Sequence, residues 1–225
     1  MEYFRRFAEP TRAPERPDPK RRVIYERQYG ITAPSVDRNG VSRLVTAGLF
    51  PCFAVALHDR ERRVGMLTHI DRTSDTAPTV ARALKDMLSL GGRKFRIYTV
   101  NLASPYLASH EYPNDPAKAQ EAIEGRIEAM QEVAHVFEQN GILDVEESEE
   151  RMVSAVIDIG NVTGAVLDVH TGVQGVPNEQ LGLTNSELTA NINYLKWMNP
   201  LIAAGNPPPI TCGYRPVYQA PRKKK

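Results

Sequence analysis

The stretch CFAVALHDRERRVGMLTHI occupies residues 52–70 and decides the fold prediction. Residues 52–58 and 64–70 are two apolar runs of strand length. The polar segment 59–63 between them is short enough to predict an antiparallel hairpin. Alternate side chains of a strand point to opposite faces, so one face carries Phe53, Val55 and Leu57. That face is uniformly large and apolar, which is typical of a face that packs on a core.

The opposite face of this hairpin carries small side chains and two reactive ones. If the turn is centred near Arg60 and Glu61, Cys52 lies directly opposite His69. Directly opposed residues have Cβ atoms about 4.5–5.5 Å apart, which lets a thiol touch an imidazole. The spacing therefore predicts a Cys52–His69 pair at the open end of the hairpin.

A thiol beside an imidazole is a recognised nucleophile. A free cysteine has a pKa of about 8.5 and is mostly protonated at neutral pH. A neighbouring imidazole can take the proton and hold the thiolate as an ion pair. The thiolate can then attack a carbonyl carbon, and the imidazolium can protonate a leaving nitrogen. The alternative is that Cys52 is a small core residue and His69 an ordinary hydrogen-bonded side chain.

The remaining chain alternates between strand and helix patterns. Strands are predicted at 42–46, 94–100, 152–159 and 162–170, and helices at about 78–90, 116–139 and 185–198. The stripe of the first helix is Val80, Ala83, Leu84, Met87 and Leu88, and that of the second is Ile123, Ile127, Met130, Ala134 and Phe137. This mixture predicts an α/β or α+β sandwich, and of the two we expect the α+β fold, a layered β-sandwich with flanking helices.

Composition divides the chain into three parts. Residues 1–22 are rich in Pro, Arg and Glu and are predicted to form a flexible basic tail. Residues 23–205 are predicted to form one domain. Residues 206–225 read as a second Pro-rich basic tail, with Tyr214, Val217 and Tyr218 as points at which it could dock on the domain.

Bulk properties exclude several classes of protein. A net charge of +1 gives no global field for binding nucleic acid. No apolar run approaches the roughly 20 residues that span a bilayer, and the N-terminus lacks the apolar region of a Sec-type signal peptide. The expectation is a cytoplasmic protein without membrane insertion, with non-Sec secretion as an alternative. The two cysteines form no disulfide framework, and no histidine spacing matches a metal site, so no cofactor is expected.

The residues around Cys52 also carry a family resemblance. The run TAGLFPCFAVALHD at 46–59, followed by GMLTH at 65–69, resembles the CheD family of chemoreceptor glutamine deamidases, with its T-x-G-L-x-x-C-x-A-V-x-L-x-D pattern. The resemblance covers roughly residues 43–175. The segment from Leu67 to Asp71 is similar to protein N-terminal asparagine amidohydrolases of the same cysteine hydrolase superfamily, which also holds the cytotoxic necrotizing factor toxins. Phe50-Pro51 stand where CheD proteins usually have Gly-Ser, so the entrance to the site is expected to differ.

This resemblance implies a CheD-like α/β/β/α layering and the catalytic set Thr46, Cys52 and His69. Cys52 would attack the carboxamide of a Gln or Asn in a protein substrate, ammonia would leave protonated by His69, and water would hydrolyse the thioester. Thr46 would orient the imidazole. Asp71, on the same strand face as His69, is an alternative orienting group, or else a cap of the following turn.

Three other functions stay open at this stage. The fold could serve as a non-catalytic binding module that docks a regulatory protein partner. It could belong to a secreted deamidase effector that acts on a host protein. A cysteine peptidase would use the same residue pair.

Overall fold

The computed structural model describes residues 16–49, 52–71, 73–101, 108, 112–141, 152–159 and 162–217. Its strands are β1 Arg21–Val23, β2 Gln28–Thr32, β3 Arg43–Ala47, β4 Ala54–Asp59, β5 Val64–His69, β6 Lys94–Val100, β7 Met152–Ile159, β8 Gly164–Asp168, β9 Gly172–Val176 and β10 Thr211–Tyr214. Its helices are α2 Thr76–Ser89, α4 Pro116–Gln139 and α5 Asn185–Ala203, with short 3₁₀ turns η1 Thr73–Asp75 and η2 Asn178–Leu181.

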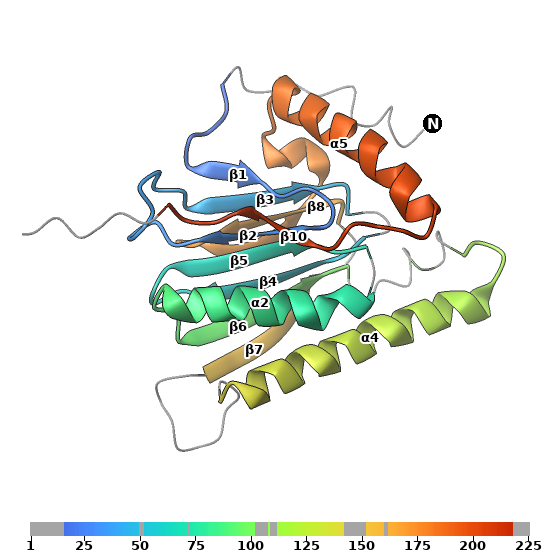
Figure 1. Ribbon diagram of the computed structural model, residues 1–225, viewed down its shortest axis with the longest axis horizontal. Coiled ribbons are helices and arrows are strands. Elements are labelled where there is room, and N and C mark those ends of the chain that lie inside the picture. Colours follow the sequence, from blue (N-terminus) through green and yellow to red (C-terminus); the bar gives the residue numbers. More distant parts are fainter. Residues whose placement is uncertain are drawn as a thin grey trace, which may run out of the picture.

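These strands form two sheets. The larger has the order β10-β2-β5-β4-β6-β7, with antiparallel pairing at its centre and parallel pairs at both edges. The smaller has the order β1-β3-β8-β9. Figure 1 shows the larger sheet behind α2 and α4, and α5 at the other end of the molecule. The prediction of an α+β fold is confirmed at this level.

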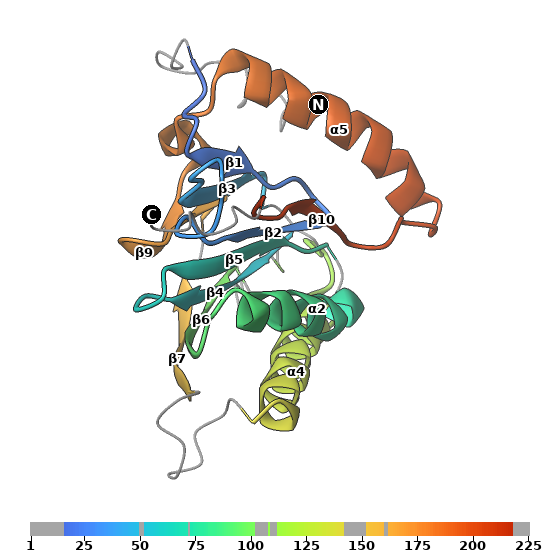
Figure 2. The ribbon, with the colours of Figure 1, turned by 60° about the vertical axis from the view of Figure 1, so that its left-hand side comes forward.

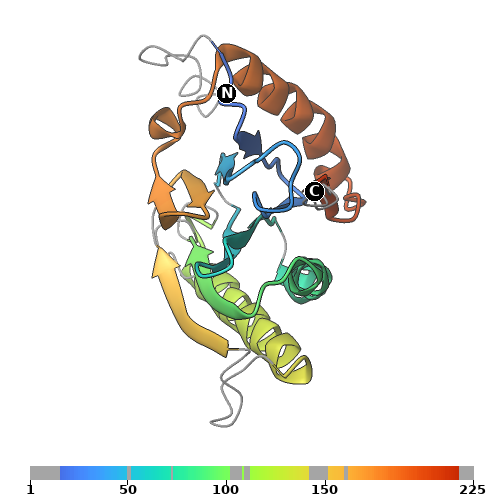
Figure 3. The same cartoon turned by 90° about the vertical axis from the view of Figure 1, so that its left-hand side faces the viewer.

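Burial separates the layers. Phe53, Val55 and Leu57 pack with α2 and α4 on one face of the larger sheet. Cys52 and Leu67 point to the other face, where they meet side chains of the smaller sheet. Figures 2 and 3 show the same arrangement from other directions: α2 and α4 lie on one side of the larger sheet, and α5 lies beyond β1. Both face assignments made for the hairpin are therefore confirmed.

The register of the β4–β5 hairpin differs from the predicted one by two residues. Asp59 pairs with Val64, and the same register leads to a bridge between Phe53 and Ile70. The turn is thus centred on Glu61 and Arg62. Asp59 fixes it by accepting a hydrogen bond from the backbone N of Arg62, 2.9 Å away.

A shift of two residues keeps every side chain on its predicted face, because the strand period is two. It does change the partner of Cys52, which is now in register with Asp71. The predicted direct opposition of Cys52 and His69 is wrong, and the two residues are diagonal neighbours instead.

Helix α2 confirms its predicted stripe, whereas α4 does not. Val80, Ala83, Leu84 and Met87 of α2 are buried. The buried side chains of α4 are Ala119, Arg126, Ala129, Val133 and Phe137, and Ile127 is 43% exposed. Two stripes with helical spacing both end at Phe137, so periodicity alone does not choose between them. The rotation turns Arg126 into the interior.

The C-terminal segment joins the larger sheet. β10 pairs in parallel with β2, and Ile210 is buried. The Tyr214 hydroxyl donates to Oδ2 of Asp37 at 2.6 Å, and the backbone N of Val217 donates to Oδ1 of the same residue at 3.1 Å. The domain therefore extends past residue 205. Tyr214 docks through its side chain as the sequence suggested, whereas Val217 is held through its backbone and is 49% exposed. Tyr218 lies outside the described residues.

Within the described part of the chain, no helix combines the length and apolar character needed to cross a membrane.

Candidate functional site

Thr46 and His69 meet between the two sheets. Thr46 lies in β3 of the smaller sheet, which pairs with β8, and His69 ends β5 of the larger one. Their contact is a hydrogen bond between Thr46 Oγ1 and His69 Nδ1, 2.7 Å long. Thr46 is fully buried and His69 is 1% exposed. The structure therefore brings together two of the three residues that the sequence singled out, on strands from different sheets.

The other ring nitrogen of His69 is available for chemistry. His69 Nε2 is buried and has no hydrogen-bond partner among the described residues. Burial without a charged partner lowers the pKa of His69 to about 3. The imidazole is therefore neutral at physiological pH, and its ring orientation is set by Thr46.

Cys52 reaches the same face of the larger sheet but contacts a different residue. Its thiol donates a hydrogen bond to Oε1 of Glu26, with 3.8 Å between Sγ and the oxygen. Cys52 is 6% exposed. Burial raises the pKa of the thiol well above its usual value, the negative charges of Glu26 and Asp71 raise it further, and Arg126 opposes them. The resting side chain is a protonated thiol.

Glu26 and Arg27 belong to the site although no sequence pattern points to them. Both lie in the turn between β1 and β2, and the backbone N of Arg27 donates to the carbonyl of His69 at 2.9 Å. This places the turn at the end of β5. Burial and the charge of Asp71 raise the pKa of Glu26 to about 7, against the opposing effects of the thiol hydrogen bond and Arg27.

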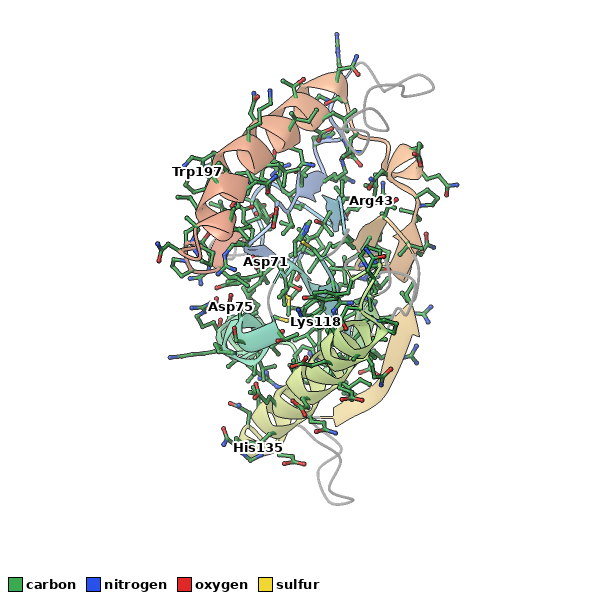
Figure 4. The ribbon with its side chains drawn as sticks, turned by 90° about the vertical axis from the view of Figure 1, so that its right-hand side faces the viewer. Arg43, Asp71, Asp75, Lys118, His135 and Trp197 are labelled. Carbon is green, nitrogen blue, oxygen red and sulfur yellow. The ribbon has the colours of Figure 1, made fainter. Side chains whose placement is uncertain are left out.

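Asp71 is held by Arg27, and no hydrogen bond joins it to His69 among the described residues. Arg27 Nη1 lies 2.5 Å from Asp71 Oδ1, and Nη2 lies 2.8 Å from Asp75 Oδ2. Figure 4 shows Asp71 and Asp75 between α5 and α2, with Lys118 on α4 nearby. Asp71 therefore does not orient the imidazole, which Thr46 holds. Asp75 precedes α2 and makes no side-chain capping bond.

The loop that leads into Cys52 is anchored from both sides. Gly48 adopts φ 76°, a left-handed conformation that favours glycine, and its backbone N donates to the carbonyl of Thr163 at 2.9 Å. Asn101 is buried at the end of β6, and its side-chain amide donates to the carbonyl of Leu49 at 2.8 Å. Phe50 and Pro51 lie outside the described residues. Asn101 therefore positions the loop. In the sequence it stands out only as a polar residue directly after the apolar strand 94–100.

A cleft of about 860 Å³ opens beside the end of the hairpin. Phe53, Asp71, Thr73 and Ser74 form one wall, and the N-terminal half of α4, including Arg126, forms the other. Oδ2 of Asp71 is buried and has no hydrogen-bond partner in the described part of the chain. The cleft is polar and lies next to the strand ends that carry Cys52 and His69.

The described residues contain no group of three or more His, Cys, Asp or Glu side chains that could hold a metal ion. Thiol, imidazole and carboxyl are the reactive groups gathered here, and together they suit nucleophilic attack with proton transfer. Comparison of the whole chain with models of known protein families finds no match, and comparison with curated protein sequences finds none.

Proposed function

We propose that the protein is a cysteine-dependent deamidase that hydrolyses the side-chain carboxamide of Gln or Asn in a protein substrate. The observation that carries the proposal is the Thr46–His69 hydrogen bond between the sheets, on the same face of the larger sheet as Cys52. These three residues are the ones that match the CheD pattern, and they come from three segments of the chain. Two packed sheets with helices outside them also suit a CheD-like α/β/β/α layering.

In the proposed reaction Cys52 Sγ bonds to the carbonyl carbon of the carboxamide. The thiol gives up its proton, the nitrogen takes one proton and leaves as ammonia, and a thioester remains. Water then attacks the thioester, which yields the carboxylic acid and restores the thiol. His69 Nε2 is a proton carrier for this scheme because Thr46 fixes the ring through the other nitrogen.

The substrate would reach the site through the cleft beside Asp71. Cys52 is nearly enclosed, so a carboxamide at the tip of an extended side chain suits the site better than a main-chain peptide bond. The cleft has both signs of charge on its walls, from Asp71 and Arg126, and this suits a polar protein segment.

The test is ammonia release from a library of peptides that contain Gln and Asn, followed by mass spectrometry for replacement of the amide by an acid. Cys52→Ala is expected to lower the rate by about 10⁴-fold or more, as for loss of a covalent nucleophile. Cys212→Ala is the matched control, because Cys212 is an exposed thiol far along the chain. An active Cys52→Ala protein contradicts the proposal, and peptide cleavage would indicate a peptidase instead.

One observation favours a non-catalytic binding module as a second candidate. The thiol of Cys52 contacts a carboxyl group rather than the imidazole, and its pKa is raised. A Cys52 that stays unlabelled by iodoacetamide at neutral pH, together with no ammonia release, supports this second candidate.

A further inference from the structure

Glu26 is a buried carboxyl group in contact with the sulfur of Cys52. Its side chain lies in the turn between β1 and β2 and is 7% exposed. The thiol is 3.8 Å from Oε1 and is the donor of the hydrogen bond. A buried carboxyl group is costly unless it has a partner, and here the thiol is one partner. Glu26 is therefore placed where the proton of the nucleophile already points.

His69 does not have that position. The hairpin register makes Cys52 and His69 diagonal neighbours rather than directly opposed residues, and the thiol of Cys52 donates its hydrogen bond to Glu26. The described residues offer no hydrogen-bond partner to His69 Nε2. Of the two groups that could take the thiol proton, Glu26 is the one in contact with it.

Charged and titratable groups surround Glu26 from several elements. Asp71 follows β5 and adds a negative charge, Arg27 is the next residue and adds a positive one, and Tyr194 reaches it electrostatically from α5. Arg126 of α4 acts on Cys52. The result is a carboxyl group with a pKa of about 7, which suits a group that must both accept and donate a proton near neutral pH.

We infer that Glu26 is a fourth catalytic residue, which accepts the proton of the Cys52 thiol and passes it to the departing nitrogen. As Sγ bonds to the amide carbon, the S–H proton moves to Oε1 of the ionised Glu26 and the carbonyl electron pair moves to oxygen. As the C–N bond breaks, the neutral Glu26 returns that proton to nitrogen, and ammonia leaves. The inference rests on the proposed function.

Glu26 then serves the first half of the reaction, and His69 serves the second. Attack of water on the thioester needs a base, and the proton taken from water must then reach the sulfur that leaves. The neutral Nε2 of His69 can take the proton of water and give it to sulfur. Formation of the thioester then depends on Glu26, and its hydrolysis depends on His69.

The experiment compares Glu26→Gln with the wild type in two assays. Ammonia release from the peptide library is expected to fall by ~100-fold or more, the usual contribution of a general acid–base group. Alkylation of Cys52 by iodoacetamide at a fixed, mildly alkaline pH is expected to rise several-fold, because the charge of Glu26 raises the pKa of the thiol. Because a damaged fold would also expose this buried thiol and lower ammonia release, urea unfolding of Glu26→Gln is measured alongside and must give the midpoint of the wild type.

Two further variants complete the test. Asp75→Asn is the matched control, because it removes a carboxylate from the same arginine, Arg27, without contacting sulfur, and both rates should stay near those of the wild type. Glu26→Asp keeps the charge but shortens the side chain. It should lower ammonia release while Cys52 stays as unreactive as in the wild type.

The outcomes separate the inference from the function on which it rests. Ammonia release by Glu26→Gln at the wild-type rate overturns the inference alone. A rise of both rates overturns it too, because Glu26 would then only restrain the nucleophile. Absence of ammonia release from the wild type overturns the proposed function and the inference with it.

Discussion

Two hydrogen-bonded pairs share one site in this protein, and they are built differently. Thr46 and His69 lie in strands of opposite sheets, and the surrounding ladders fix both. Cys52 and Glu26 lie outside the regular strands, where a loop and a turn meet, among the charges of Arg27 and Asp71. The first pair depends on the sheets, and the second depends on ion pairs at their edge.

Burial affects the two pairs in opposite directions. It lowers the pKa of His69 to about 3 and raises that of Glu26 to about 7, in each case because a buried group disfavours its charged form. His69 is therefore neutral at physiological pH, whereas Glu26 exchanges between its neutral and ionised forms near neutral pH. Catalysis at such a site needs proton transfers within it rather than a preformed thiolate–imidazolium ion pair.

The largest effect is expected from removal of Arg27, which supports the Cys52–Glu26 pair. Its side chain is 3% exposed and bridges Asp71 and Asp75. Arg27→Ala leaves the carboxylate of Asp71 buried without its cation and should lower the free energy of unfolding by about 3–5 kcal/mol. Urea unfolding measures this loss.

Asp75→Asn is the comparison for that measurement. The side chain of Asp75 is 33% exposed, and an exposed ion pair contributes little. Its loss should therefore be a small fraction of the loss for Arg27→Ala. Equal losses would mean that burial of the Arg27–Asp71 pair is not what stabilises the turn.

Thr46→Val tests the other pair and should have the next largest effect. The substitution preserves the shape of the side chain but removes the hydroxyl group, so Nδ1 of His69 stays buried without its hydrogen bond. We expect the free energy of unfolding to fall by about 1–3 kcal/mol and ammonia release to fall with it. Thr46→Ser keeps the hydroxyl group and should retain most of the stability.

The rate at which iodoacetamide alkylates Cys52 in Thr46→Val shows whether the Thr46–His69 and Cys52–Glu26 pairs are independent or form one connected network. The thiol contacts Glu26 and not Thr46, so its rate of reaction with iodoacetamide should change little. A large change would show that the two pairs are coupled, which would contradict the separation described above.

The same contrast explains what the sequence could predict. The faces of the β4–β5 hairpin, the bounds of α4 and the stripe of α2 follow from local periodicity, which a sequence displays directly. His69 follows from the spacing of the hairpin, whereas Thr46 follows only from the resemblance to the CheD pattern. The predicted register of this hairpin is wrong by two residues because the position of the turn depends on which of the polar residues after Asp59 donates a hydrogen bond to it.

Glu26 and Arg126 could not be predicted in this way. The turn that carries Glu26 takes its position from the pairing of β2 with β5, which joins segments about forty residues apart and leaves no local pattern. Arg126 is buried because α4 uses the less apolar of two stripes. Contacts set by long-range pairing are absent from short motifs, so the second pair becomes visible only in the fold.

His69 and Glu26 should make the free energy of unfolding depend on pH in opposite directions. Between pH 6.5 and about 3, unfolded His69 binds a proton that the folded form lacks, so His69 makes stability fall as the pH falls. Between pH 4.5 and about 7, folded Glu26 keeps a proton that the unfolded form has lost, so Glu26 makes stability fall as the pH rises. Where the windows overlap, the two effects oppose each other.

A substitution at Glu26 or at His69 should leave only the pH dependence of stability that the other residue contributes. In Glu26→Gln only the His69 effect remains, and the free energy of unfolding should fall on acidification by about 1.4 kcal/mol per pH unit more than in the wild type. In His69→Gln it should instead rise by a similar amount. Urea unfolding at a series of pH values measures both, and other carboxyl groups cancel because they titrate alike in both variants. Parallel profiles for the two variants would mean that burial does not set their protonation in opposite directions.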